Sequence, residues 1–156
     1  MKKWSTMLMT FAVTLVLSVP VSSMEANNSV DCVHSWHYVK QKIKQAKAYI
    51  KENGSKAYIQ ALKAKKFDGQ NEYMFAIDYR GNILAHPFVQ LHDVNGWDFY
   101  DSDRVYMVRE MVKMAKYNGK GWIEYQFKHH QTGQVVPQLV YIERVNNRFF
   151  IGLATY

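Results

Sequence analysis

The sequence predicts an α+β fold in which a long N-terminal helix packs on an antiparallel β-sheet. Three observations support this prediction. Apolar side chains recur three and four positions apart over residues 36–50, which is the spacing of an amphipathic helix. Two β-rich runs over residues 73–87 are joined by a short turn that contains Gly81, as in a hairpin. Three further β-rich runs over residues 121–154 have short connections, which requires antiparallel pairing because a parallel crossover needs about a dozen residues or more.

The composition is typical of one folded domain. The chain has 156 residues, of which 48% are apolar and 21% charged, and this balance excludes a disordered or collagen-like chain. A single cysteine excludes an internal disulfide framework. The formal net charge is +7, but the basic residues are spread over helices and do not alternate with aromatic residues along one strand. We therefore expect no nucleic-acid binding.

The first residues have the layout of a secretory signal peptide. Lys2 and Lys3 precede an apolar run over residues 7–17, and Ser22 and Ser23 follow that run. The run is shorter than the roughly 20 residues that span a bilayer. We therefore predict an exported protein that is periplasmic or secreted, and that is not membrane-embedded once the signal has been removed.

The signal peptide also determines the predicted domain boundaries. We expect residues 1–23 to be the cleaved signal, with a second cleavage position after Ala26. Residues 24–35 are then a flexible N-terminus, and residues 36–156 form one domain. Removal of residues 1–23 lowers the formal charge from +7 to +5, because two lysines lie within them.

The helical segments have recognisable ends. Residues 53–54, Asn-Gly, end the first helix because both tolerate the left-handed conformation of a C-cap. Ser55 caps a second, shorter helix that stops near residues 67–69. A third helix is expected to begin after an Asp103 cap and to stop at residues 118–119. The lysines of the first helix form a solvated face, although a basic helix can also lie against anionic lipid.

The strands are bounded in the same way. Pro87 ends the hairpin, because proline has no backbone N–H to donate to a strand ladder. The last three strands are expected at residues 121–128, 135–144 and 148–154.

No motif with a specific catalytic geometry occurs in the sequence. It lacks a serine nucleophile elbow, a glycine-rich phosphate loop, paired metal-binding cysteines and a His-Glu-x-x-His helix. We therefore expect no enzyme, no metal site and no cofactor. Asp98 and Asp101 are expected to be solvated. His86, at a strand end, either faces a pocket or bonds to the neighbouring loop, and both interpretations stay open.

Aromatic and amide side chains gather on the predicted strands. They are Tyr73, Trp122, Tyr125, Gln138 and Tyr141. Such residues either pack a core or line a small polar pocket, and their positions in the sequence do not decide between the two. Trp122 and Tyr125 point to opposite faces of a regular strand, so both can line one pocket only if a bulge intervenes.

Several segments together resemble a known family. The most specific is Asp78-Tyr79-Arg80-Gly81-Asn82-Ile83-Leu84-Ala85-His86-Pro87, and the others are residues 67–69, 72–78, 108–112, 121–125, 137–141 and 151–156. In this order they resemble the single Cache domain family, the extracytoplasmic PAS-like sensory domains of bacteria. The resemblance covers about residues 36–156.

The resemblance implies a long helix beside a PAS-like sheet that cups a small ligand, commonly an organic acid or a similar metabolite. Carried over position by position, the ligand-binding residues are His86, Arg109, Trp122, Tyr125, Gln138 and Tyr141. Two positions depart from the family pattern. Gln138 stands where the family often has a lysine, which removes a cation able to pair with a carboxylate. In the loop over residues 96–106, Arg104 replaces the usual glycine.

Two functional hypotheses follow. The first is an exported sensory-type domain that binds a small organic acid or similar metabolite in a pocket of the β-sheet. The sequence ends at Tyr156, so we expect a free-standing protein whose partner is a membrane receptor or transporter. The alternative is a structural or interaction module of the cell envelope with no free ligand pocket.

Overall fold

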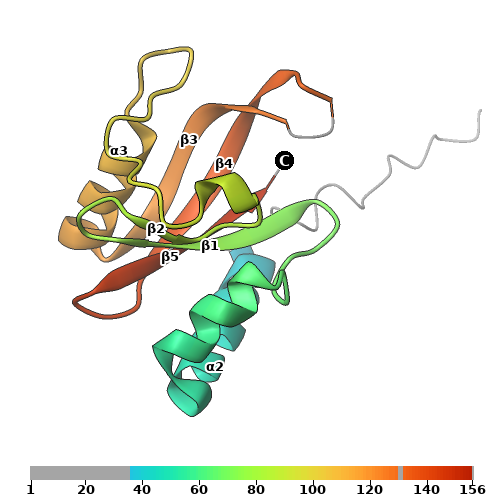
Figure 1. The fold of residues 1–156 in the computed structure, drawn as a ribbon, viewed down its shortest axis with the longest axis vertical. Helices are drawn as coiled ribbons and strands as arrows, with labels where there is room; N and C mark the ends of the chain where they lie inside the picture. Colours follow the sequence, from blue (N-terminus) through green and yellow to red (C-terminus); the bar gives the residue numbers. More distant parts are fainter. Residues whose placement is uncertain (1–35, 130–131, 156) are drawn as a thin grey trace, which may run out of the picture.

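The long helix α2 (Trp36–Lys63) changes direction at one residue. A computed structural model describes residues 36–129 and 132–155, and the predicted signal peptide and flexible N-terminus lie outside them. Within α2, Gly54 has φ 83° and ψ 161°, a conformation that glycine adopts without the Cβ clash of other residues. The predicted break at Asn53-Gly54 is therefore confirmed, and it turns the second half of α2 back onto the sheet (Figure 1).

Five antiparallel strands form the sheet. Their order is β2-β1-β5-β4-β3, so the N-terminal hairpin and the C-terminal strands meet where β1 pairs with β5. The predicted α+β fold is confirmed: a helix packs on a five-stranded antiparallel sheet. The strands are β1 (Glu72–Asp78), β2 (Ile83–Ala85), β3 (Lys120–Lys128), β4 (Val135–Arg144) and β5 (Phe149–Thr155).

The two faces of the sheet bury separate cores, because successive side chains of a strand point to opposite sides. In Figure 1, α2 lies on one side of the sheet and α3 (Met107–Lys113) on the other. The α2 face buries Val39, Ile43, Ala46, Tyr58, Leu62, Met74, Ala76, Ala85, Tyr141, Phe149, Ile151 and Leu153. The α3 face buries Tyr73, Phe75, Ile77, Ile83, Val108, Met111, Val112, Ala115, Tyr125, Val140, Ile142, Phe150 and Ala154.

The helix on the second face begins later than predicted. Asp103 does not cap it: α3 starts at Met107, and the N-cap position, Tyr106, makes no side-chain hydrogen bond. The helix continues as a π-helical turn, η2 (Met114–Asn118), and ends at Gly119, which is left-handed with φ 77°. The predicted stop at residues 118–119 is thus confirmed. The predicted start is wrong, because Asp101 holds the preceding backbone in a separate turn.

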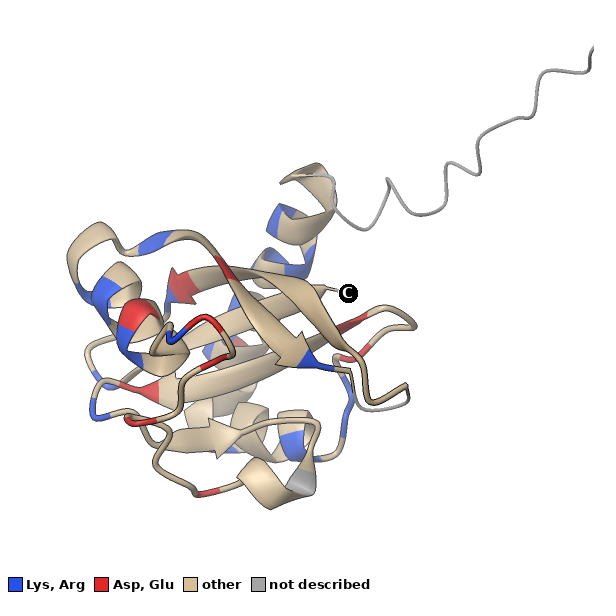
Figure 2. Cartoon of the chain, turned by 90° about the horizontal axis from the view of Figure 1, so that it is seen from above, with Lys and Arg blue, Asp and Glu red and all other residues tan. Residues whose placement is uncertain are grey.

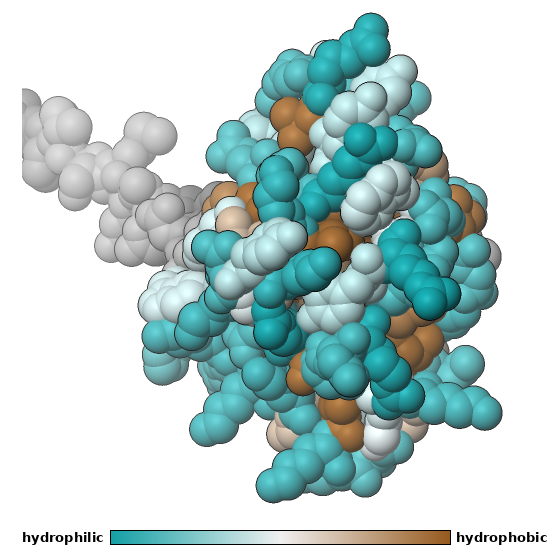
Figure 3. Space-filling view, turned by 90° about the vertical axis from the view of Figure 1, so that its left-hand side faces the viewer, coloured by the Kyte–Doolittle hydropathy of each residue, from teal (hydrophilic) through white to brown (hydrophobic). Residues whose placement is uncertain are grey.

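The face of the molecule that Figure 3 shows is mostly hydrophilic. Figure 3 shows one face of the molecule, on which brown hydrophobic atoms occur in small separate groups among teal ones. Among residues 36–129 and 132–155, no helix combines the length and the apolar character that a bilayer crossing requires.

Candidate functional site

A buried amide on the α3 face is held by two tyrosines. The Oε1 atom of Gln138 accepts a hydrogen bond from the Tyr73 hydroxyl at 3.0 Å and from the Tyr125 hydroxyl at 2.9 Å. Gln138 is fully buried. Tyr125 and Gln138 are direct partners across β3 and β4, so their side chains share one face. Tyr73 stands on β1, and β5 lies between β1 and β4.

The other end of that amide is unsatisfied. With Oε1 accepting from both hydroxyls, Nε2 presents its two N–H groups to the remaining side. Nε2 is buried and has no hydrogen-bond partner within the part of the chain that the structure describes. Leaving a buried donor without a partner costs about 1–3 kcal/mol. Gln138 Nε2 is therefore a buried donor for which this part of the protein supplies no acceptor oxygen.

His86 lies beside Tyr73 at the end of the hairpin. Its ring centroid is 5.0 Å from that of Tyr73 and 4.9 Å from that of Phe88, and the residue is 7% exposed. Burial, with a smaller contribution from the nearby His92, lowers its pKa from 6.5 to about 3. The imidazole is therefore neutral at physiological pH.

The neutral His86 has a defined tautomer. Its Nδ1 atom accepts a hydrogen bond from the Phe88 backbone N–H at 3.2 Å. A nitrogen that accepts is unprotonated in a neutral imidazole, so the proton lies on Nε2. The carbonyl of His86 bonds to the ring Nε2 of His92, which fixes the chain just after β2. The site thus holds a second neutral N–H donor.

The loop between His86 and α3 is anchored by a carboxylate. Asp101 Oδ1 accepts from the backbone N–H groups of Asp103 and Val105, at 2.9 and 2.8 Å, and Oδ2 accepts from Gln126 on the edge strand β3 at 2.9 Å. Burial acts to raise the pKa of Asp101, but these backbone N–H groups outweigh it and lower the pKa. The prediction that Asp101 is solvated is therefore wrong, since the residue is 7% exposed.

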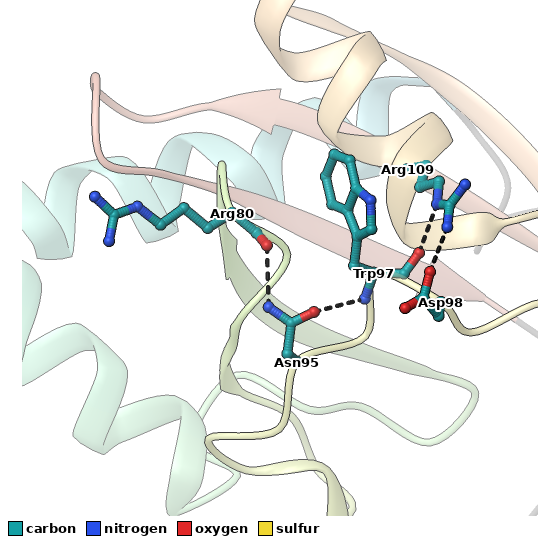
Figure 4. A network of polar contacts seen from close by, with 5 residues as sticks. All are labelled: Arg80, Asn95, Trp97, Asp98 and Arg109. Carbon is teal, nitrogen blue, oxygen red and sulfur yellow. Dashed lines mark hydrogen bonds and ion pairs between the residues drawn. The ribbon is translucent and has the colours of Figure 1, made fainter.

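A second network joins the same loop to the hairpin and to α3 (Figure 4). Asn95 donates to the Arg80 carbonyl at 3.0 Å and accepts from the Trp97 N–H at 3.0 Å. Arg109 Nε donates to the Trp97 carbonyl at 2.8 Å, and its Nη2 pairs with Asp98. The prediction that Asp98 is solvated agrees with the 83% exposure of its side chain. The loop is thus attached to the hairpin, to α3 and to β3.

The structure brings some of the predicted site residues together and separates the others. Tyr125 and Gln138 touch, and His86 lies against Tyr73, their common neighbour. Arg109 is held at the loop by Trp97 and Asp98.

Trp122 and Tyr141 lie on the α2 face instead. They are 5.2 Å apart between ring centroids, and each packs against Trp36 of α2. The β3–β4 register runs without a bulge, so positions three apart must face opposite sides. Ligand contact by Trp122 and Tyr141 stays a prediction. Because both lie on the α2 face, they cannot contact the same ligand as Gln138 and His86 on the α3 face.

Two residues of this region were not selected from the sequence. Tyr73 was grouped with the strand aromatics but not assigned to the site, although its alternation with Phe75 and Ile77 puts it on the face of Tyr125. Phe88 follows Pro87 in a loop, where no periodicity indicates a direction. Its ring stacks on Phe127 with centroids 6.0 Å apart, and it closes one side of the region.

The described residues offer no metal centre. Within residues 36–129 and 132–155, no three histidine, cysteine or acidic side chains lie close enough to hold one ion. On the α3 face, the two neutral donors Gln138 Nε2 and His86 Nε2 belong to side chains that contact the rings of Tyr73, Tyr125 and Phe88.

Comparison with known proteins identifies the fold family. Residues 22–147 match the family described as Single Cache domain 2. The chain belongs to this single Cache domain family. The resemblance noted from the hairpin and strand segments is therefore confirmed.

Solved Cache domains share its fold. A Cache chemosensory domain studied for carboxylic acid recognition has a TM-score of 0.63 at 22% identity, and the match covers 77% of this chain and 88% of that one. A methyl-accepting chemotaxis protein from Vibrio parahaemolyticus has a TM-score of 0.63 at 20% identity, covering 77% of this chain and 84% of that one. The periplasmic sensor domain of a chemotaxis protein has a TM-score of 0.62 at 19% identity, covering 77% and 88%.

One curated relative is a signalling enzyme. The sensor histidine kinase MctS of Rhizobium johnstonii is 26% identical over 112 residues, which are 70% of this chain and 24% of the kinase. The Cache domain described here thus corresponds to a sensor-type module and spans about a quarter of that protein.

Proposed function

We propose that this Cache domain is exported and binds a small carboxylic acid on its α3 face, between Gln138, His86 and the two tyrosines. The observation that carries the proposal is the buried Nε2 of Gln138, which has no partner among the described residues while Oε1 has two. A ligand oxygen that accepts from Nε2 would remove the cost of that unsatisfied donor.

The donor chemistry favours a carboxylate over a cation. Gln138 Nε2 and His86 Nε2 are both neutral donors, and the low pKa of His86, about 3, keeps its ring from offering a charge. A carboxylate has two oxygens and about four lone-pair positions, so it can accept from both residues at once. An amine has no acceptor for these donors once it is protonated. The aromatic rings of Tyr73, Phe88 and Phe127 would enclose a short apolar tail.

The relatives support the same substrate class. One solved structural neighbour is a Cache domain described for carboxylic acid recognition. This chain has the same fold, and Gln138 supplies a hydrogen-bond donor on its sheet. The likeness to sensor domains also supports export to the periplasm or beyond the cell, and it favours a membrane receptor as partner. The N-terminal layout of residues 1–23 is consistent with such export.

Calorimetric titration tests the proposal directly. Small mono- and dicarboxylic acids are titrated beside their primary amides, which keep the shape and lose the charge. We expect at least one acid to bind and its amide to bind more weakly. The substitution Gln138→Met keeps the side-chain length and removes both donors, and it should weaken binding by about 10- to 100-fold, since hydrogen bonds to charged groups contribute roughly 1.5–3 kcal/mol.

A matched control lies on the opposite face. Trp122→Phe changes an aromatic side chain of the α2 face at the far side of the same strand pair, and it should leave the affinity within about twofold of wild type if ligand binds only the α3 face. Equal losses in Gln138→Met and Trp122→Phe would contradict the assignment. No binding by any acid would favour the alternative of an interaction module without a ligand.

A further inference from the structure

Helix α2 carries a row of lysines on its solvent side. Lys40, Lys44, Lys47 and Lys51 are spaced by four, three and four residues, which places them on one face of the helix. All four are exposed. At 1.5 Å of rise per residue the row is about 16 Å long. In Figure 2, blue segments mark lysines on the first turns of α2, at the top of the picture.

These lysines line a groove rather than a convex ridge. The groove has a volume of about 520 Å³, and its walls are Lys40, Ile43, Lys44, Lys47, Ala48, Lys51 and Glu143. We call it the lysine groove. It lies between α2 and the end of β4, on the face of the sheet away from Gln138.

The positive charge of the lysine groove is largely uncompensated. Its lining includes one acidic residue, Glu143. This carboxylate forms an ion pair with Lys47, with an Nζ to Oε1 distance of 2.6 Å. Glu143 also accepts from the Tyr141 hydroxyl at 3.1 Å. Among the described residues, Lys44 and Lys51 have no ion-pair partner, and the Lys40 ammonium lies over the Trp36 ring at 4.5 Å from its centroid. Three net positive charges therefore line one groove.

We propose that the lysine groove docks this domain onto a bilayer surface that carries anionic phospholipids. Charge complementarity supports this occupant, because each lysine near an anionic bilayer adds about 1 kcal/mol of attraction. Trp36, which is 43% exposed at the end of the row, is of the residue type that favours the headgroup region. The proposal is separate from ligand binding, since it concerns the opposite face of the sheet.

The mode of docking follows from what α2 has already buried. Its apolar positions Val39, Ile43 and Ala46 pack against the sheet, so the helix has no free apolar face to insert among acyl chains. Binding is therefore peripheral and electrostatic. It should weaken steeply with salt, because the Debye length falls from about 10 Å at 0.1 M to about 3 Å at 1 M.

Vesicle sedimentation tests the proposal. The protein is purified from its host after any processing of the N-terminus. It is then mixed with vesicles of equal parts phosphatidylglycerol and phosphatidylcholine, and with vesicles of phosphatidylcholine alone. We expect sedimentation with the anionic vesicles, little with the neutral ones, and release at high salt. The double substitution Lys44→Glu/Lys51→Glu should weaken partition to the anionic vesicles by at least about 20-fold, at roughly fivefold for each lysine.

The matched control carries the same change of net charge elsewhere. Lys66 and Lys128 are exposed and form no ion pair among the described residues, and Lys66→Glu/Lys128→Glu should keep partition within about threefold of wild type. Circular dichroism and thermal melting confirm that both variants fold. Equal losses in the two variants, equal binding to both vesicle types, or binding to a soluble polyanion such as heparin without binding to vesicles would each overturn the proposal. Loss of acid binding with vesicle binding intact would count only against the ligand site.

Discussion

The two faces of the sheet differ in how they treat polar groups. On the α2 face charged groups meet at the rim, where Glu72 accepts from Tyr38 and pairs with Lys42 at 3.1 Å. Asp68 Oδ1, near this pair, is buried without a partner among the described residues, and the core of this face consists of aromatic rings and aliphatic chains. On the α3 face a glutamine and a histidine stand inside the core, and Gln138 Nε2 has no partner in the described residues. The core of the α2 face is therefore apolar, whereas the α3 face keeps a buried unsatisfied donor, which we propose a ligand uses.

The largest expected effect separates stability from binding. Tyr141 is 2% exposed on the α2 face between Trp36 and Trp122. Tyr141→Ala should lower the free energy of unfolding by about 3–5 kcal/mol, as for other large aromatic truncations. Gln138→Met should lower it by less, about 1–2 kcal/mol, because the apolar side chain removes the unsatisfied Nε2 donor but also removes the Oε1 acceptor of the Tyr73 and Tyr125 hydroxyls. Urea denaturation measures both, and similar losses in the two variants would contradict the division between the faces.

Acid should destabilise the α3 face through His86. The unfolded chain binds this proton near pH 6.5, whereas the folded chain does so only near pH 3, so the contribution is complete above pH 6.5 and declines as the pH falls. Linkage predicts a loss of about 1.6 kcal/mol between pH 6.5 and 5 from this residue.

Denaturation at several pH values isolates that contribution. His86→Asn keeps an acceptor for the Phe88 N–H and cannot titrate, so its stability should depend less on pH over this range. If His86→Asn retains the full slope, His86 is not buried in its neutral form.

The loop that covers the α3 face should loosen without Asp101. Asp101→Asn leaves one acceptor oxygen for the three backbone N–H groups that now bind the carboxylate, and we expect a loss of about 1–2 kcal/mol. Because the folded pKa of Asp101 is lowered, the wild-type contribution is present at neutral pH and declines as the pH falls toward that pKa. Hydrogen exchange at Gln126 should quicken in the variant, and unchanged exchange there would argue against the anchor.

The smallest effect compares two tyrosine hydroxyls. Among the described residues, the hydroxyl of Tyr58 on the α2 face bonds to the sulfur of Met74 alone, at 3.9 Å, so Tyr58→Phe should cost less than about 0.5 kcal/mol. Tyr125→Phe on the α3 face removes a bond to Gln138 Oε1 and should cost about 1 kcal/mol and weaken acid binding. Thermal melting with and without ligand measures both. Equal behaviour of the two variants toward ligand would remove the distinction.

Regular structure could be predicted from the sequence because it follows local rules. The break at Gly54, the stop at Gly119 and the three final strands follow from glycine conformation and from residue alternation. The same alternation predicts that Trp122 and Tyr125 face opposite sides of the sheet, and the unbroken pairing of β3 with β4 confirms this. Family resemblance alone had placed both in one pocket.

The remainder depends on contacts between distant segments. Asp101 looked like a solvated loop residue because its partner Gln126 lies 25 positions away. Arg109 occupies a position that the family resemblance assigns to ligand binding, but the backbone of Trp97 and the carboxylate of Asp98 hold its side chain at the loop. The orientation of the Gln138 amide depends on two tyrosines from two other strands. These three contacts join segments far apart in the sequence, so the spacing of residues along the chain does not predict them.

A crystal structure of the domain with a bound small carboxylic acid tests the central claim most directly. The account predicts a carboxylate oxygen at about 2.7–3.2 Å from Gln138 Nε2, the usual range for such a hydrogen bond, with the His86 ring directed toward the same ligand. An acid bound on the α2 face, or a Gln138 Nε2 that donates to the protein while the acid lies elsewhere, would contradict it.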